Sequence, residues 1–176
     1  MSRFLVHFLA ASMLFALARS LTAAPNTAAW TPIENQVAQI TAGPQVTIVH
    51  FWAPWCPNCR AELDKFGWRD FMIVNPDVKV VFVTIWSADD GAAVLKKAGV
   101  TEQANFQLVV HPNTSRKEED RMQTFMGESI SWIPTTWVFK DGQLRFALNY
   151  GEQHFSLLQQ LVRDASDKWE HTIAPK

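Results

Sequence analysis

The sequence has few cysteines and no long run of like charge. Only 2 of its 176 residues are cysteines, which is too few for a framework of several structural disulfides. The 16 basic and 17 acidic residues nearly balance and form no block of one sign, which argues against a nucleic-acid partner. Internal repeats and low-complexity tracts are also missing. The composition is that of an ordinary globular chain, 48% hydrophobic.

The N-terminus carries a short apolar stretch. Arg3 precedes an apolar run from Phe4 to Ala18, and small residues follow as far as Ala24. This order is typical of a secretory signal peptide, and the run is shorter than the roughly 20 residues of a membrane-spanning helix. We therefore expect residues 1–24 to be a signal peptide whose cleavage position stays open. The protein would be exported, either periplasmic or held by an uncleaved N-terminal membrane anchor facing the periplasm.

The remaining residues, about 150, are enough for one domain with a sizeable core. A lead-in over residues 25–45, with a short amphipathic helix at 30–39, is expected to precede a domain over residues 46–170. Strands are predicted at 46–53, 78–86, 106–110, 135–140 and 144–149, and helices at 56–69, 88–98, 115–126 and 152–169. This alternation predicts an α/β fold with a central sheet covered on both faces. The Asp141-Gly142 turn makes the last pair of strands antiparallel.

Both cysteines lie in one Cys-x-x-Cys motif, Cys56 to Cys59, between a predicted strand and a predicted helix. Two thiols at this spacing across a helix start lie on one face, within reach of a disulfide. Cys56 is the expected nucleophile, because the N–H groups and positive dipole at a helix N-terminus favour the thiolate. Pro57 suits the first helical turn. A purely structural bridge is the alternative, but closing so short a loop removes little entropy from the unfolded chain.

Residues Trp55 to Cys59, directly after a buried strand, resemble the Trp-Cys-x-x-Cys motif of the thioredoxin superfamily. The segments Cys59-Arg60-Ala61-Glu62 and Pro134-Thr135-Thr136 are similar to those of exported thiol-disulfide oxidoreductases of the TlpA/ResA type. The resemblance covers roughly residues 46–162. It implies a thioredoxin-like fold with a mixed central sheet flanked by helices, and a central insertion of one helix and one strand.

The resemblance also implies the surroundings of the motif. Pro134 matches the family's cis-proline, which would face the two cysteines, and the backbone of Ile133 would pair with an extended substrate segment. Trp55 is expected to be an exposed wall of the site, and Pro57 belongs to the same substrate-binding surface. A trans proline at a strand edge is the alternative for Pro134.

Two residues are candidates for the group that accepts the proton of Cys59. His50 stands six residues before Cys56, at a position where relatives carry a carboxylate or an amide, and alternation along the strand points it beneath the motif. Its imidazole can take a proton near neutral pH, although a packed core histidine is the alternative. Glu62 lies one helical turn beyond Cys59 and matches a glutamate of ResA-like proteins. The alternative for Glu62 is an acid favoured by the helix dipole.

These features predict an enzyme that reduces disulfides in exported proteins through the Cys56–Cys59 pair, with apocytochrome c as one candidate substrate. A membrane thiol donor would supply the electrons, and neither a cofactor nor a metal is implied. An oxidase or isomerase is the enzymatic alternative, because the direction depends on the reduction potential. A copper-handling or substrate-holding module is the non-enzymatic one, although copper-transfer proteins of this fold generally space their cysteines one residue wider. Substrate identity and oligomeric state do not follow from the sequence.

Overall fold

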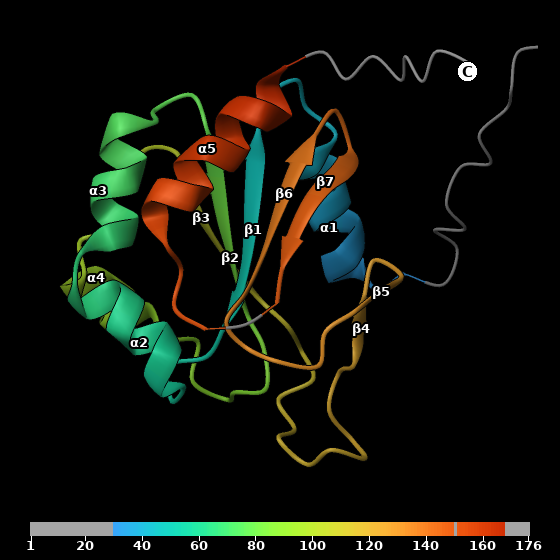
Figure 1. Ribbon diagram of the computed structural model, residues 1–176. Helices are drawn as coiled ribbons and strands as arrows, with labels where there is room; N and C mark the ends of the chain where they lie inside the picture. Colours follow the sequence, from blue (N-terminus) through green and yellow to red (C-terminus); the bar gives the residue numbers. More distant parts are fainter. Residues whose placement is uncertain (1–29, 150, 168–176) are drawn as a thin grey trace, which may run out of the picture.

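A five-stranded mixed sheet forms the centre of the protein (Figure 1). The computed structural model describes residues 30–149 and 151–167. The strands follow the spatial order β3-β2-β1-β6-β7 and span Phe106–Val110 (β3), Lys79–Thr84 (β2), Thr47–Trp52 (β1), Thr135–Lys140 (β6) and Gln143–Leu148 (β7). β1, β2 and β3 are parallel, whereas β6 is antiparallel to β1 and β7 to β6. The mixed sheet and its antiparallel last pair are confirmed.

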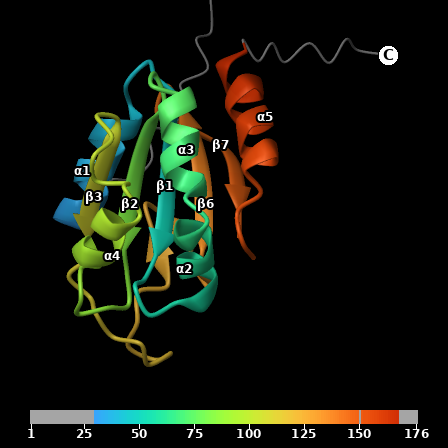
Figure 2. The ribbon, with the colours of Figure 1, turned by 90° about the vertical axis from the view of Figure 1, so that its left-hand side faces the viewer.

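Helices cover both faces of this sheet. They are α1 (Pro32–Thr41), α2 (Pro57–Asp64), α3 (Gly67–Val74), α4 (Ala92–Lys97) and α5 (Phe155–Ser166). α1 packs on one face, and α2, α3 and α5 lie on the other (Figure 2). α4 connects β2 to the edge strand β3. Together, α4 and β3 are the additional helix and strand expected from the sequence.

β1 is the central strand, and all six of its residues are buried. Because successive side chains point to opposite faces, neighbouring residues enter different halves of the core. His50 contacts the rings of Trp68 and Phe82 on one side of the sheet. Phe51 packs against Phe125 and Trp137 on the other. β1 ends at Trp52, so the cysteine motif follows at the edge of the core.

The single helix predicted over residues 56–69 is wrong, because the chain breaks between α2 and α3. Phe66 adopts a left-handed conformation with φ of 57°. Gly67 follows, and a Cβ at this position would lie 2.1 Å from a ring carbon of Phe155. Only glycine therefore allows α5 to approach this closely. The break turns α3 so that Trp68 enters the core.

The helix predicted over residues 115–126 is also wrong. The segment forms turns, followed by a short hairpin of β4 (Thr124–Phe125) and β5 (Glu128–Ser129). Asn113 accepts a hydrogen bond from the backbone of Ser115 and donates one to the carbonyl of Asp120. Such bonds between side chain and backbone compete with helix formation. The spacing of Met122 and Phe125 reflects burial in the core and not a helix face.

The predicted signal peptide over residues 1–24 lies outside the described residues. Within the part of the chain that the structure describes, no helix combines the length and apolarity needed to cross a bilayer. The lead-in helix corresponds to α1, whose Thr31 and Glu34 form a reciprocal capping box. Glu34 also accepts a hydrogen bond of 2.6 Å from the backbone of Met126, which ties α1 to the β4–β5 hairpin.

Candidate active site

Cys56 occupies the N-cap position of α2, directly beyond the end of β1. Its sulfur accepts a hydrogen bond from the backbone N–H of Cys59 at 3.4 Å, and its thiol lies 3.7 Å from the carbonyl oxygen of Ile133. Both cysteines are free thiols. The N-cap position arises because Pro57 begins the helix without needing a partner for an N–H. The structure therefore places Cys56 where the predicted nucleophile should lie.

The surroundings of Cys56 favour its thiolate. The pKa of Cys56 is lowered from its ordinary value to about 7, first by a hydrogen bond from the Cys59 thiol and then by the backbone N–H groups of Cys59 and Asn58. Burial acts in the opposite direction, with an effect second only to that of the Cys59 thiol. Half of the Cys56 thiols are thus ionised near neutral pH, which suits an attacking thiol.

Cys59 has the opposite character. It is almost completely buried, and burial raises the pKa of its thiol far above the ordinary range. The hydrogen bond that it gives to Cys56 and the negative charges of Cys56 and Glu62 raise this pKa further. Cys59 is therefore a thiol at neutral pH and needs a base before it can react.

The two pKa values predict how alkylation depends on pH. In the reduced protein, the rate at Cys56 should rise about tenfold per pH unit below pH 7 and level off above it, because only the thiolate reacts. Cys59 should stay unmodified over that range. Iodoacetamide labelling followed by peptide mass spectrometry measures both rates. Faster labelling of Cys59 at neutral pH would reverse the assignment of the two roles.

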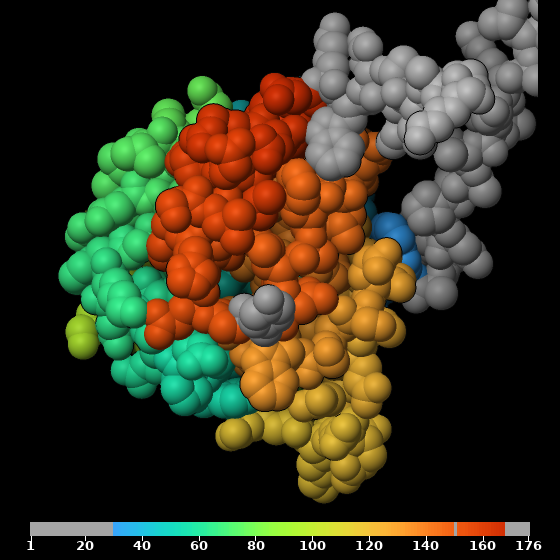
Figure 3. All heavy atoms as spheres, viewed as in Figure 1, coloured from blue at the N-terminus to red at the C-terminus, as the bar shows by residue number. Residues whose placement is uncertain are grey.

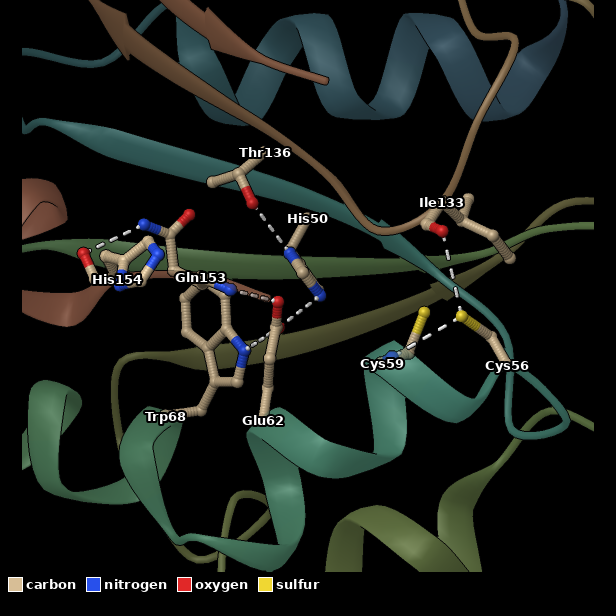
Figure 4. A network of polar contacts seen from close by, with 9 residues as sticks. All are labelled: His50, Cys56, Cys59, Glu62, Trp68, Ile133, Thr136, Gln153 and His154. Atoms are coloured by element: carbon tan, nitrogen blue, oxygen red, sulfur yellow. Dashed lines mark hydrogen bonds and ion pairs between the residues drawn. The ribbon is translucent and has the colours of Figure 1, made fainter. Parts of the chain in front are cut away.

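A buried carboxylate and imidazole lie next to the cysteines (Figure 4). Glu62 Oε2 is 3.3 Å from His50 Nε2 and accepts a 2.8 Å hydrogen bond from Trp68 Nε1. Glu62 Oε1 accepts a 2.6 Å hydrogen bond from the backbone N–H of Gln153. His50 Nδ1 lies 2.9 Å from Thr136 Oγ1. In Figure 4, the thiol of Cys59 lies between this group and Cys56.

Burial moves the pKa values of this pair in different directions. It raises the pKa of Glu62 to about 7, even though the hydrogen bonds from Trp68 and Gln153 act the other way. It lowers the pKa of His50 to about 3. The imidazole is therefore neutral at pH 7, and its contact with Glu62 is a hydrogen bond and not an ion pair. When Glu62 is ionised, His50 Nε2–H donates to it and Nδ1 accepts from the Thr136 hydroxyl.

The structure brings all the predicted site residues to one region. The Ile133–Pro134 bond is cis, and the carbonyl of Ile133 faces the Cys56 thiol. Trp55 is 38% exposed, and its indole lines a pocket with Pro57 and Ile133. His50 and Glu62, treated separately in the sequence, are direct neighbours.

Sequence reasoning did not identify three contributors to this site. Trp68 and the backbone of Gln153 bind the Glu62 carboxylate, and Thr136 binds His50. The sequence contains a signal for Thr136, since this polar residue follows Pro134 by two residues and belongs to the segment Pro134-Thr135-Thr136. The sequence contains no such signal for Trp68 and Gln153, because their positions depend on the break at Gly67 and on the packing of α5.

The described residues hold no group of three or more histidine, cysteine or acidic side chains that could bind a metal ion. The pair of sulfurs, the buried carboxylate and the neutral imidazole match the needs of thiol–disulfide exchange: a thiolate, a second thiol and a nearby base.

Comparisons with known proteins agree with this fold. Residues 33–166 match the family of thioredoxin-like domains. Sporulation thiol-disulfide oxidoreductase A of Bacillus subtilis (strain 168) is 27% identical over 111 residues, which are 62% of this chain and 61% of that protein. The chain thus spans less than two thirds of the length of this curated relative.

Two solved structures share the fold. A secreted disulfide oxidoreductase of Mycobacterium tuberculosis superposes with a TM-score of 0.51 at 20% identity, covering 71% of this chain and 85% of the other. A thioredoxin-like superfamily protein gives 0.54 at 14% identity, with coverage of 74% and 86%. The family match covers most of the chain, and it confirms the resemblance carried by the Trp-Cys-x-x-Cys motif: the chain belongs to the family of thioredoxin-like domains.

Proposed function

We propose that this protein is a thiol–disulfide oxidoreductase that reduces disulfides in protein substrates through Cys56 and Cys59. The observation that carries the proposal is the contrast between the two thiols. Cys56 has a pKa near 7 at a helix N-terminus, and buried Cys59 lies beside Glu62, whose carboxyl also has a pKa near 7. A purely structural disulfide requires neither a thiol of lowered pKa nor a carboxyl group beside the second cysteine.

The reaction begins at Cys56. Its thiolate attacks one sulfur of the substrate disulfide, so that a Cys56–substrate bond forms while the substrate S–S bond breaks and the other sulfur leaves as a thiolate. Cys59 then attacks the sulfur of Cys56 and releases the second substrate thiolate. The two substrate sulfurs gain two electrons, and the protein is left with a Cys56–Cys59 disulfide.

Glu62 is the proposed acceptor of the Cys59 proton. A base works best when its pKa lies near the working pH, and the Glu62 carboxyl meets this condition whereas the His50 imidazole does not. The proton then passes to the departing substrate thiolate. His50 acts as a positioning residue, because its Nε2 contacts the carboxylate while Thr136 fixes the ring.

Each turnover leaves Cys56 and Cys59 oxidised, so an outside thiol donor must supply two electrons to reduce their disulfide again. We propose a membrane thiol donor and an exported location, periplasmic or membrane-anchored, on the strength of the predicted signal peptide. Exported proteins that carry adjacent cysteines, such as apocytochrome c, are the proposed substrates, as the resemblance to TlpA/ResA-type proteins suggests.

The proposed direction predicts the reduction potential. A reductase should lie nearer the roughly −270 mV of thioredoxin than the roughly −120 mV of a strong oxidant. Equilibrium titration against dithiothreitol and glutathione, read out by thiol alkylation, gives the value. A potential above about −150 mV would favour the oxidase alternative, with the same cysteines carrying electrons in the other direction.

A further inference from the structure

A pocket of about 290 Å³ opens beside Cys56. The side chains of Trp55, Trp86 and Trp132 line it, together with Arg121. Trp55 is 38% exposed and Trp132 is 58% exposed, so the walls of this pocket expose a large apolar area to solvent. A volume of this size is at the lower limit for small-molecule sites, which span roughly 300–1,000 Å³. It suits one or two substrate side chains.

The polar atoms of two of these indoles are already used inside the protein. Trp55 Nε1 donates to the carbonyl of Trp86, and Trp86 Nε1 donates to the carbonyl of Met122, both at 2.8 Å. These bonds fix segment 111–123 against the motif. In Figure 1 this segment, coloured olive to gold, projects beyond the end of the sheet, and in Figure 3 it forms the protrusion at the bottom of the view. Because the N–H groups of Trp55 and Trp86 are already bonded to backbone carbonyls, these two indoles form apolar walls of the pocket.

Arg121 is the one basic residue that lines the pocket. Its guanidinium stacks 4.5 Å from the centre of the Trp86 ring, and its Nε is buried without a hydrogen-bond partner. Arg116 stacks in the same way over Trp55, at 3.9 Å. Among residues 30–149 and 151–167, neither arginine forms an ion pair. The nearby acids Glu118, Glu119 and Asp120 are exposed.

We propose that this pocket selects substrates with an acidic side chain next to the cysteine that Cys56 attacks. The proposal rests on the proposed function, whose exchange reaction it leaves unchanged. A guanidinium binds a carboxylate through two parallel hydrogen bonds. The apolar indole walls strengthen that attraction because they exclude water. Stacking on the indoles holds both arginines in place before the substrate arrives, which reduces the entropy cost of binding.

The test uses symmetric disulfides of three short peptides that differ only in the residue after the cysteine, which is Glu, Gln or Lys. The kcat/KM for reduction of each peptide is divided by its rate with dithiothreitol, because a neighbouring charge also changes the reactivity of the disulfide itself. The corrected value should be roughly 5- to 30-fold higher for Glu than for Gln, as expected for a partly exposed charged hydrogen bond, and lowest for Lys.

Three variants locate the preference. Arg121→Gln should bring the ratio of Glu to Gln close to one, and Arg121→Glu should make the Lys peptide the best substrate. Lys117→Gln is the matched control, since it removes a positive charge from the same segment at an exposed residue that does not line the pocket. This variant should keep the preference for Glu. Reactivity of the Cys56 thiol in each variant shows that the motif is intact.

The outcomes separate this inference from the proposed function. Equal corrected rates for the three peptides would overturn the acidic preference and leave the reductase in place. A preference that survives Arg121→Gln, or that disappears in Lys117→Gln, would also overturn it. If none of the peptides is reduced, the proposed function fails and this inference fails with it.

Discussion

Replacing Cys56 with serine is expected to abolish disulfide reduction, with a loss of at least about 10³-fold. A serine hydroxyl stays protonated where the Cys56 thiol, with its pKa near 7, is half ionised. Cys59 cannot take over, because it is buried and its pKa is raised. Reduction of insulin disulfides, followed by turbidity with an excess of dithiothreitol, measures the loss against the rate of dithiothreitol alone.

The matched variant Cys59→Ser should behave differently. The first exchange needs only Cys56, so the substrate should become attached to Cys56 and remain there as a mixed disulfide. Non-reducing electrophoresis and peptide mass spectrometry identify the adduct. Serine keeps a hydroxyl that can donate to Cys56, so the pKa of Cys56 should change little. Adducts trapped on Cys59 in the Cys56→Ser variant would contradict the assigned order of attack.

Glu62→Gln is expected to slow resolution of the mixed disulfide by roughly 10²- to 10³-fold, within the usual contribution of a general base. Glutamine keeps the shape but has a single acceptor oxygen, so it can accept the hydrogen bond from Trp68 or the one from Gln153 but not both, and it cannot accept a proton. In the unmodified protein, resolution should speed up as the pH rises through 7, because the carboxyl ionises there. The variant should lose this pH dependence. Stopped-flow tryptophan fluorescence can follow the step.

His50→Asn is the control for this experiment. His50 is neutral over the whole working range because burial lowers its pKa to about 3. Its loss should therefore slow resolution less than Glu62→Gln does, while the dependence on pH through 7 remains. If His50→Asn removes that dependence and Glu62→Gln leaves it, the histidine is the base. The first attack by Cys56 should change little in either variant.

The sequence was sufficient to locate the site because its signals are local. The strand before Cys56, the proline at the first helical position and the Asp141-Gly142 turn each depend on neighbouring residues, and the structure has all three. From the sequence, His50 and Glu62 could be considered only as separate candidates, and the contact between them could not be predicted. Alternation pointed His50 beneath the motif, but the turn of α2 that brings Glu62 to it belongs to the packed structure.

The segment between β3 and β6 could not be predicted in the same way. Met122 and Phe125 show helical spacing, but they are buried because the chain folds back across the sheet, where Phe125 meets Phe51. The same departure from a helix places Arg121 over Trp86. The pocket beside Cys56 therefore results from long-range packing, which a local pattern does not record.

The most direct test of the account is a single turnover of the reduced protein with one equivalent of a peptide disulfide. The account predicts that the peptide is released as two free thiols while Cys56 and Cys59 both disappear as thiols and form one internal disulfide. Rapid acid quenching, alkylation and peptide mass spectrometry measure all three species at once. A substrate that is reduced while Cys59 stays free, or a peptide that remains attached to Cys56, would contradict the two-thiol mechanism.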